Sequence, residues 1–393
     1  MNGLKMNELK ILIGYGESGK TTFAKEILKK TLLQFDTLPV YGTEEEWIIS
    51  MKSIASECNK RKNEEIVLDG YLVLCEDGRI KEPDFKTLKE NLKYHTIKPI
   101  IIIRKAEDIV NSIKERNPPC NPDNVNRRFI CKTYFDIFKQ FNKLPVEYYY
   151  ANNELFTKLD HSNDAYEKIT GNNWSECEEF KNYMENINEE KLNNTNYDSK
   201  YQDIELPFQY LNGYAGYADG TWNGIQDLVD WKDKTVADMG CLNGHYSFKI
   251  ADKRAEKVVG YDLFQQACDT CNKIAKINCF ENTEFRKLDA GIEEIPEEYD
   301  VILLLNMLHH ISTPKFLLEQ AFTKGKNVIM EVQFSGFSPS IQQDGGAERM
   351  IKNTKNWDKY TIMALANKYG HQLVKENRSV KPHRIILHFK KDE

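Results

Sequence analysis

The feature that most constrains the fold is the glycine-rich stretch GYGESGKTT, residues 14–22, which lies between the apolar run KILI and the helix-like stretch TTFAKEILKK. It fits the pattern G-x-x-x-x-G-K-[ST], in which backbone N–H groups and a helix N-terminus together bind phosphate groups. Lys20 would contact the β- and γ-phosphates, and the Thr21 hydroxyl would bind Mg²⁺. We therefore predict an ATP and Mg²⁺ site with contacts from Gly14, Gly16, Ser18, Gly19, Lys20, Thr21 and Thr22.

The region around this loop has the pattern of a parallel α/β sheet. Between residues 10 and 150, polar helix-like stretches alternate with the apolar runs KILI, EEIVLDGYLVL, KPIIIIRK and VEYYYAN. Short runs of this kind, bounded by Gly or Pro, are typical of buried parallel strands. At 393 residues the chain is also too long for one ordinary core. We predict a doubly wound domain at residues 1–171 and a connector at 172–204, which is rich in Asn, Glu and Lys.

Several polar residues of this first half stand where a phosphoryl-transfer site would need them. Asp69 ends an apolar run and could bind Mg²⁺ or accept a substrate proton. Asp36, in LLQFDT, lies near the end of the strand expected after the glycine-rich loop. Arg116, Arg127 and Arg128 flank a stretch rich in Pro and Asn that we interpret as a mobile flap. Their charge would suit a transferring phosphoryl group. We take these residues as candidate catalytic residues, together with the lysine of the loop.

Over roughly residues 8–150, this half resembles the P-loop small-molecule kinases. The resemblance rests on the strand, the loop, Lys20 and Thr21 in that order, and it implies a kinase that uses ATP. The substrate-binding part matches no particular subfamily. A phosphate loop also occurs in nucleotide-hydrolysing switches and in sulfotransferase-like folds, so these alternatives stay open.

A second glycine turn, of a different kind, lies in TVADMGCLNGHYSFKIA at residues 235–251. It has the order strand, D-x-G-x-x-x-G, helix, and no lysine follows it, so it is not a phosphate loop. Gly240 and Gly244 permit a tight turn against which a nucleoside can lie. Asp262 ends the next apolar run, where its carboxylate could bind both ribose hydroxyls, and Asp289 in FRKLDAG suits an adenine amine.

Over about residues 205–390, the chain resembles the class I S-adenosylmethionine-dependent methyltransferases, and the text NMLHHI matches their fourth motif. The nearest groups are the wobble-uridine tRNA methyl- and carboxymethyltransferases and the methyltransferase domains of O-antigen chain-terminating enzymes. The resemblance implies S-adenosylmethionine as cofactor and His309 as a candidate catalytic residue. The implied cofactor contacts are Asp238, Gly240, Gly244, Asp262, Leu263, Asp289, Ala290, Asn306 and Met307. An NAD-binding domain is the alternative, but it would be expected to carry G-x-G-x-x-G.

The second half also alternates apolar runs with helix-like stretches. Its six strand candidates are KTVADMG, KVVGYDL, TEFRKLDA, YDVILLLN, KNVIMEV and RIILHFKK. We assign residues 205–393 to this second domain. The predicted fold class is therefore α/β, with two doubly wound domains: a P-loop NTPase-like parallel sheet followed by a Rossmann-like class I methyltransferase sheet.

The two motifs together predict a bifunctional enzyme. The first domain would phosphorylate a hydroxyl on a small molecule or glycan, and the second would methylate the same product, or another in its pathway, including the new phosphate. Candidate cations for that phosphate are Arg349, Lys381, His383 and Arg384. The alternative is an RNA- or nucleotide-modifying methyltransferase with an accessory kinase or NTPase domain. A third hypothesis is a regulatory NTPase module that controls a methyltransferase.

Composition limits the classes of binding partner that we expect. The net charge of −6 and the pI of about 5.9 disfavour a non-specific nucleic-acid binder but leave room for a local basic patch. No stretch approaches the ~18 apolar residues of a membrane span, and the N-terminus has no signal-peptide pattern. Nine scattered cysteines predict reduced thiols, so we expect a cytoplasmic protein. The aromatic residues Tyr210, Tyr214, Tyr217 and Trp222 could cap the second site or stack on a base.

Overall fold

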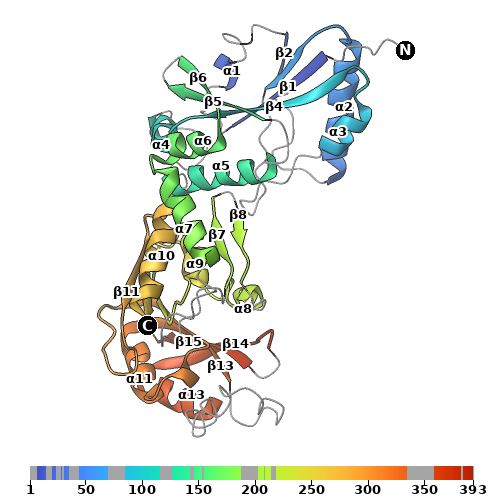
Figure 1. Ribbon diagram of the computed structural model, residues 1–393. Coiled ribbons are helices and arrows are strands. Elements are labelled where there is room, and N and C mark those ends of the chain that lie inside the picture. Colours follow the sequence, from blue (N-terminus) through green and yellow to red (C-terminus); the bar gives the residue numbers. More distant parts are fainter. Residues whose placement is uncertain are drawn as a thin grey trace. The chain divides into compact units, whose positions relative to one another are not determined.

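The computed structural model describes residues 7–14, 20–23, 28, 31–34, 44–69, 85–115, 126–141, 146–152, 155–186, 202–207, 209–213, 218–333, 358–381 and 384–392 (Figure 1). The chain divides into two compact units, each with its own sheet. Unit 1 comprises Met1–Glu178 and Pro207–Gln209, and unit 2 comprises Glu179–Leu206 and Tyr210–Glu393. The division falls within helix α7 (Trp174–Asn186), and the domain boundaries at 171 and 204 stay predictions.

Unit 1 is built on a six-stranded sheet in the order β2-β3-β1-β4-β5-β6. The first five strands in this order pair in parallel, and β6 runs antiparallel to β5. The strands are β1 (Asn7–Ile13), β2 (Thr31–Gln34), β3 (Ile66–Asp69), β4 (His95–Ile103), β5 (Glu147–Asn152) and β6 (Leu155–Leu159). The helices are α1 (Lys20–Phe23), α2 (Glu44–Lys60), α3 (Phe85–Asn91), α4 (Ala106–Glu115), α5 (Arg127–Phe141) and α6 (Ser162–Thr170), besides α7.

The sequence explains why unit 1 folds in this way. Strand β4 ends in four consecutive buried isoleucines, Ile100–Ile103, as expected for a central parallel strand with both faces covered. Helix α4 buries Ile109, Val110 and Ile113, which lie on one face at helical spacing. Helix α6 ends at Gly171, whose φ of 71° lies in the left-handed region that glycine adopts without strain.

Unit 2 is built on a seven-stranded sheet in the order β11-β10-β9-β12-β13-β15-β14. All its strands are parallel except β15, which pairs antiparallel with β13 and β14. The strands are β9 (Thr235–Met239), β10 (Lys257–Asp262), β11 (Thr283–Lys287), β12 (Tyr299–Leu305), β13 (Gly325–Gln333), β14 (His371–Arg378) and β15 (Arg384–Lys391). A separate hairpin consists of β7 (Ile204–Leu206) and β8 (Gln209–Leu211).

Helices cover both faces of this sheet. They are α8 (Ala218–Ile225), α9 (His245–Asp252), α10 (Gln265–Ile277), the 3₁₀ helix η3 (Leu308–His310), α11 (Pro314–Lys324) and α13 (Lys359–Lys368). Alternate residues of β12 enter two different cores: Leu303 packs with residues of α8, α9 and α10, and Leu304 with residues of α11 and α13. The predicted Rossmann-like doubly wound sheet of the second half is thus confirmed, and all six expected strands are present.

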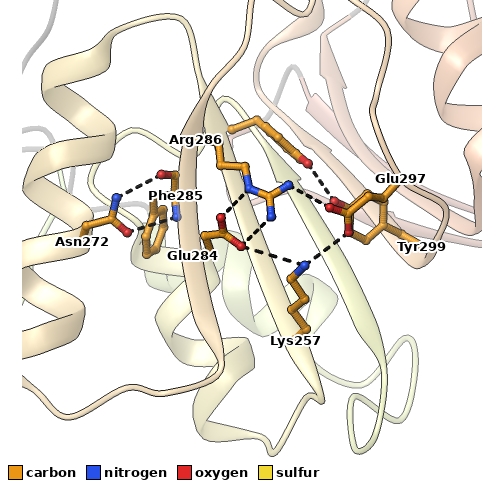
Figure 2. A network of polar contacts seen from close by, with 8 residues as sticks. Lys257, Asn272, Glu284, Phe285, Arg286, Glu297 and Tyr299 are labelled. Carbon is orange, nitrogen blue, oxygen red and sulfur yellow. Dashed lines mark hydrogen bonds and ion pairs between the residues drawn. The ribbon is translucent and has the colours of Figure 1, made fainter.

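Edge strand β11 is protected by side chains (Figure 2). The Asn272 amide donates to the Phe285 carbonyl at 3.0 Å and accepts from the Phe285 N–H at 3.2 Å. On the same strand, the Arg286 guanidinium is bonded to Glu284 and, at 2.7 Å, to Glu297. Charged and capped edges of this kind discourage pairing with another chain. Within the described ranges, no helix has the length and apolar character that a membrane span requires.

Candidate functional site

The glycine turn of unit 2 wraps around the end of the neighbouring strand β10. The N–H groups of Gly240 and Cys241 both donate to the Tyr261 carbonyl, at 2.7 and 3.0 Å. Gly240, Leu242 and Gly244 have φ values of 72°, 48° and 75°. This left-handed region favours glycine, which explains why the turn carries two glycines. The turn therefore exposes backbone where a bound nucleoside could approach it.

The turn lies at the topological switch point of the sheet. Strand β9 leads through α9 to β10 on one side, and its other neighbour, β12, leads away to β13. In open parallel sheets, ligands bind in the crevice at the carboxyl ends of the strands where the connections diverge in this way. The ends of β9, β10, β12 and β13, and the start of the antiparallel β15, therefore share the edge where a ligand site is expected.

The carboxylate of Asp262 is held rigidly beside the turn. Its Oδ2 accepts from the Leu242 N–H at 2.9 Å and its Oδ1 from the Phe264 N–H at 3.0 Å. Burial raises its pKa, and these backbone hydrogen bonds oppose the shift. Each carboxylate oxygen keeps further lone pairs, so the group can still accept hydrogen bonds from a diol. The next residue, Leu263, is half exposed, and its predicted contact with a cofactor stays a prediction.

Asp238, in contrast, is used inside the protein. Its side chain is only 1% exposed, and its Oδ2 accepts from the Ser247 hydroxyl at 2.6 Å. Burial raises the pKa of this carboxyl to about 6. The described contacts of Asp238 therefore connect β9 to α9 beneath the turn, and its predicted contact with a cofactor stays a prediction.

The residues predicted on the adenine side and below the turn lie at the same edge. Asp289 Oδ1 accepts from the Gly291 N–H at 2.9 Å, and Ala290 follows it, buried. Asn306 has a φ of 60°, and its N–H donates to the Glu331 carbonyl at 3.2 Å. A β-carbon built on Gly240 would lie 3.5 Å from Met307 Cβ, so Met307 forms the floor under the turn.

A buried polar cluster occupies the ends of β12 and β13 and the start of β15. The Glu331 side chain, 1% exposed, accepts through Oε1 from Thr221 Oγ1 of α8 at 3.1 Å and from Ser379 Oγ. Its Oε2 lies 4.0 Å from Nη1 of Arg384, whose side chain is 9% exposed. Burial lowers the pKa of Lys381, and the neighbouring Arg384 charge lowers it further. The cluster is therefore cationic but contains one fixed carboxylate.

His309 is buried beside this cluster. Its pKa is lowered to about 3, mainly by burial and further by His310 and Arg384. The two histidine rings lie 4.0 Å apart, centroid to centroid. A neutral imidazole can donate one hydrogen bond and accept another, and the catalytic role of His309 stays a prediction.

Comparison with known proteins identifies the class of unit 2. Residues 230–378 match the family described as methyltransferase domain. This part of the chain is a class I S-adenosylmethionine-dependent methyltransferase domain. It lies within the stretch where the sequence motifs indicated this class.

Three curated relatives share the name tRNA U34 carboxymethyltransferase. The protein from Campylobacter fetus subsp. fetus (strain 82-40) is 32% identical over 119 residues, which cover 29% of this chain and 41% of that protein. The protein from Nautilia profundicola is 29% identical over 119 residues, covering 28% and 38%. The protein from Helicobacter pylori (strain P12) is 32% identical over 100 residues, covering 24% and 37%. The chain thus matches about two fifths of the length of these relatives.

The phosphate loop of unit 1 is described at its two ends. Gly14 follows β1, and Lys20, 8% exposed, begins α1 and donates through Nζ to the Gly14 carbonyl at 3.0 Å. The Lys20 ammonium thus reaches back to the residue that precedes the loop, and the phosphate-loop assignment stays a prediction. Gly16, Ser18 and Gly19 lie outside the described residues, and the Thr21 and Thr22 side chains are not described.

The other candidates of unit 1 are only partly described. Asp69 is the last residue of β3, but its side chain is not described, and Asp36 and Arg116 lie outside the described residues. Arg127 and Arg128 are the first two residues of helix α5, and residues 116–125, which precede them, lie outside the described residues, so the candidate catalytic role of the two arginines stays a prediction. The Arg127 guanidinium donates to the Thr170 carbonyl and forms an ion pair with Glu107 at 3.9 Å, so its described contacts hold α4, α5 and α6 together.

Sequence reasoning missed the centre of the polar cluster in the methyltransferase domain. Glu331 ends the apolar run KNVIME, the same signal that pointed to Asp69 and Asp262. Thr221 and Ser379 carried no signal, because they lie 110 and 48 residues from Glu331 in the chain. Arg349 and His383 lie outside the described residues.

Proposed function

We propose that the methyltransferase domain transfers a methyl or carboxymethyl group from an S-adenosylmethionine-type donor to an RNA nucleoside. The names of the three relatives support RNA over the phosphorylated small molecule or glycan that the sequence first suggested. The net charge of −6 argues against non-specific RNA binding, so recognition would depend on a local surface. The observation that carries the proposal is the Asp262 carboxylate, fixed beside the glycine turn at the carboxyl edge of the matched domain.

In this proposal the donor lies across the switch point. Asp262 binds the ribose hydroxyls, the backbone of Gly240 and Gly244 approaches the nucleoside, and Asp289 faces the adenine amine. Leu263, Ala290, Asn306 and Met307 complete the pocket, and Asp238 supports it from below. Methyl transfer needs mainly proximity and alignment of the acceptor with the sulfonium, so the chain's own task is to bind and orient.

The cationic cluster supplies the site for a negatively charged group. Arg384 and Lys381 lie at the edge that the donor occupies in this proposal, and a guanidinium can bind two oxygens of a carboxylate or phosphate at once. The charge could belong to a carboxymethyl group on the donor or to a phosphate of the acceptor. Both sources need the same chemistry from the protein.

The test is transfer to tRNA, followed by mass spectrometry of the digested nucleosides. Unmodified tRNA is incubated with the protein and either S-adenosylmethionine or a donor that carries a carboxymethyl group on sulfur. The proposal predicts one new modified nucleoside, absent with Asp262→Ala, and the mass gained identifies the transferred group. Transfer to glycans or small molecules but not to tRNA would contradict it.

A second activity is supported by unit 1, and we propose that this unit binds ATP with Mg²⁺. What supports this proposal is Lys20, which begins α1 and donates through Nζ to the carbonyl of Gly14, the residue that follows β1. In the order β2-β3-β1-β4-β5, the connections of β1 and β4 leave in opposite directions, so the loop lies at a switch point. ATP turnover that requires an added hydroxyl acceptor would identify a kinase, and turnover without one would favour a regulatory NTPase. The absence of nucleotide binding would contradict both.

A further inference from the structure

Glu331 has no role in the proposed donor site, yet this buried residue connects several elements at that edge. Its backbone carbonyl accepts from the Asn306 N–H at the end of β12. Its Oε1 accepts from Thr221 of α8 and from Ser379, which follows β14. A carboxylate that is 1% exposed is expensive to bury unless it is paired and hydrogen-bonded, so two hydroxyl donors on one oxygen are a substantial compensation.

The two oxygens of this carboxylate are used differently. Among the described residues, Oε2 accepts no hydrogen bond, and it faces Nη1 of Arg384 at 4.0 Å, which is an ion-pair distance but too long for a hydrogen bond. The hydroxyl donors fix Oε1 and therefore fix the direction in which Oε2 points. Arg384 is thus attracted to one side by a charge whose position is set by α8 and by Ser379.

The charge of Glu331 also limits how strongly the cluster attracts anions. Arg384 and the partly buried Lys381 are like charges that act on each other, and the charge of Arg384 already lowers the pKa of Lys381. The Glu331 carboxylate opposes that effect on Lys381, because an opposite charge favours the protonated amine. It therefore leaves the cluster positive enough to hold an anion, but less so than two cations alone.

We propose that Glu331 is a positioning residue: it aims the Arg384 guanidinium at the negatively charged group of the reactants and prevents tight, unproductive anion binding. This inference depends on the proposed function, because it assumes that an anionic group enters this cluster during transfer. It assigns Glu331 no contact with the reacting atoms. Removal of its charge should therefore strengthen the binding of anions while lowering the rate of transfer.

The experiment compares Glu331→Gln with wild type in the full chain, with inorganic phosphate as the anion. Glutamine keeps the shape and an oxygen for the two hydroxyls but removes the charge. We expect kcat for transfer to fall about tenfold or more, while phosphate inhibits at a concentration several-fold lower. The Kd for S-adenosylmethionine should stay within about twofold of wild type. Glu331→Asp should recover part of kcat and restore the weaker inhibition by phosphate.

Controls separate this inference from a general loss of structure. Glu376→Gln removes an exposed carboxylate of β14 that pairs with Lys359, and it should behave as wild type. If Glu331→Gln does not fold, Thr221→Val removes one hydroxyl donor without changing charge and should lower kcat at unchanged donor affinity.

Two results would overturn the inference: unchanged kcat in the variants of Glu331 and Thr221, or a fall in kcat without tighter inhibition by phosphate in Glu331→Gln. Failure of the wild-type protein to bind S-adenosylmethionine would instead refute the proposed function. If the wild type transfers the group and Glu331→Gln has the same kcat and the same inhibition by phosphate, this inference alone would be refuted.

Discussion

The two glycine turns of this chain follow equivalent strands of their sheets, but the charged side chain beside each turn has the opposite sign. Each turn follows the first strand of its sheet and lies at a switch point, where a ligand crevice is expected. In unit 1 the turn is followed by Lys20, whose Nζ donates to the Gly14 carbonyl. In unit 2 no lysine follows, and the turn is held by the carboxylate of Asp262. In our proposal the fold provides the location in both units, and the charge beside the turn selects the end of a nucleotide-like ligand that binds there: the phosphates in unit 1 and the ribose in unit 2.

The largest expected effect comes from removing the cation of the first turn. Lys20→Ala should reduce ATP turnover about 10²-fold or more, because a charge that stabilises a transferring phosphoryl group in a water-poor site is worth at least that much. Turnover is measured by phosphate release and by transfer to added hydroxyl acceptors. Lys52→Ala removes an exposed lysine of α2 and serves as the matched control. Equal turnover by Lys20→Ala and wild type would refute the phosphate-loop assignment.

Removing the anion of the second turn should have the next largest effect. Asp262→Ala should weaken S-adenosylmethionine binding by roughly 1.5–3 kcal/mol, because the ribose hydroxyls lose a charged acceptor. Burial raises the pKa of this carboxyl, so wild-type affinity should also fall as the pH decreases through that raised value, where the group becomes neutral. Titration calorimetry across pH measures both effects. Affinity that is unchanged by the substitution would exclude Asp262 from the donor site.

Alanine should destabilise the protein to different extents at the two glycines of the second turn. Both have left-handed φ values, so alanine costs about 1–2 kcal/mol at either. At Gly244 the added β-carbon would also lie 2.7 Å from Phe248 Cε2, whereas at Gly240 the nearest atom is 3.5 Å away. Gly244→Ala should therefore lower the free energy of unfolding more than Gly240→Ala, by about 1–3 kcal/mol. Chemical denaturation of both variants measures the difference, and equal losses would show that packing around Gly244 yields to the methyl group.

Loss of the Asp238 charge should stabilise the fold, whereas loss of the Asp262 charge should weaken ligand binding. Its pKa is about 6 in the folded protein and 3.8 when unperturbed, so the folded state holds the proton more tightly. Its contribution to stability is therefore fully present below pH 3.8 and is lost as the pH rises through about 6. Asp238→Asn keeps an oxygen for Ser247 and should raise the free energy of unfolding by roughly 2 kcal/mol at neutral pH, with no gain near pH 4. A loss of stability at neutral pH would contradict the buried, raised-pKa description.

Sequence reasoning identified what depends on local pattern. Strands such as β12, YDVILLL, and β15, RIILHFKK, were predictable because they contain continuous apolar runs, whereas β14, HQLVKENR, was missed because it is largely exposed and polar. The positions of Gly240, Gly244 and Asp262 could be expected because a turn and the end of the next strand are local features.

What could not be predicted depends on contacts between distant residues. Arg127 was chosen for its charge beside a stretch rich in Pro and Asn, and its contact with the Thr170 carbonyl, 43 residues away, could not be expected from that pattern. Asp238 matched a cofactor motif, but whether its carboxylate faces a ligand or Ser247 depends on the packing of α9. The Glu331 cluster joins three distant parts of the chain, and nothing local in the sequence marks the hydroxyl partners of Glu331, Thr221 and Ser379.

The central claim is that the two turns bind two different ligands through opposite charges. Calorimetric titration of ATP with Mg²⁺ and of S-adenosylmethionine into wild type, Lys20→Ala and Asp262→Ala tests it most directly. The account predicts that wild type binds both ligands at once, that Lys20→Ala weakens ATP binding alone, and that Asp262→Ala weakens S-adenosylmethionine binding alone. Competition between the two ligands, or one substitution that weakens both, would contradict it.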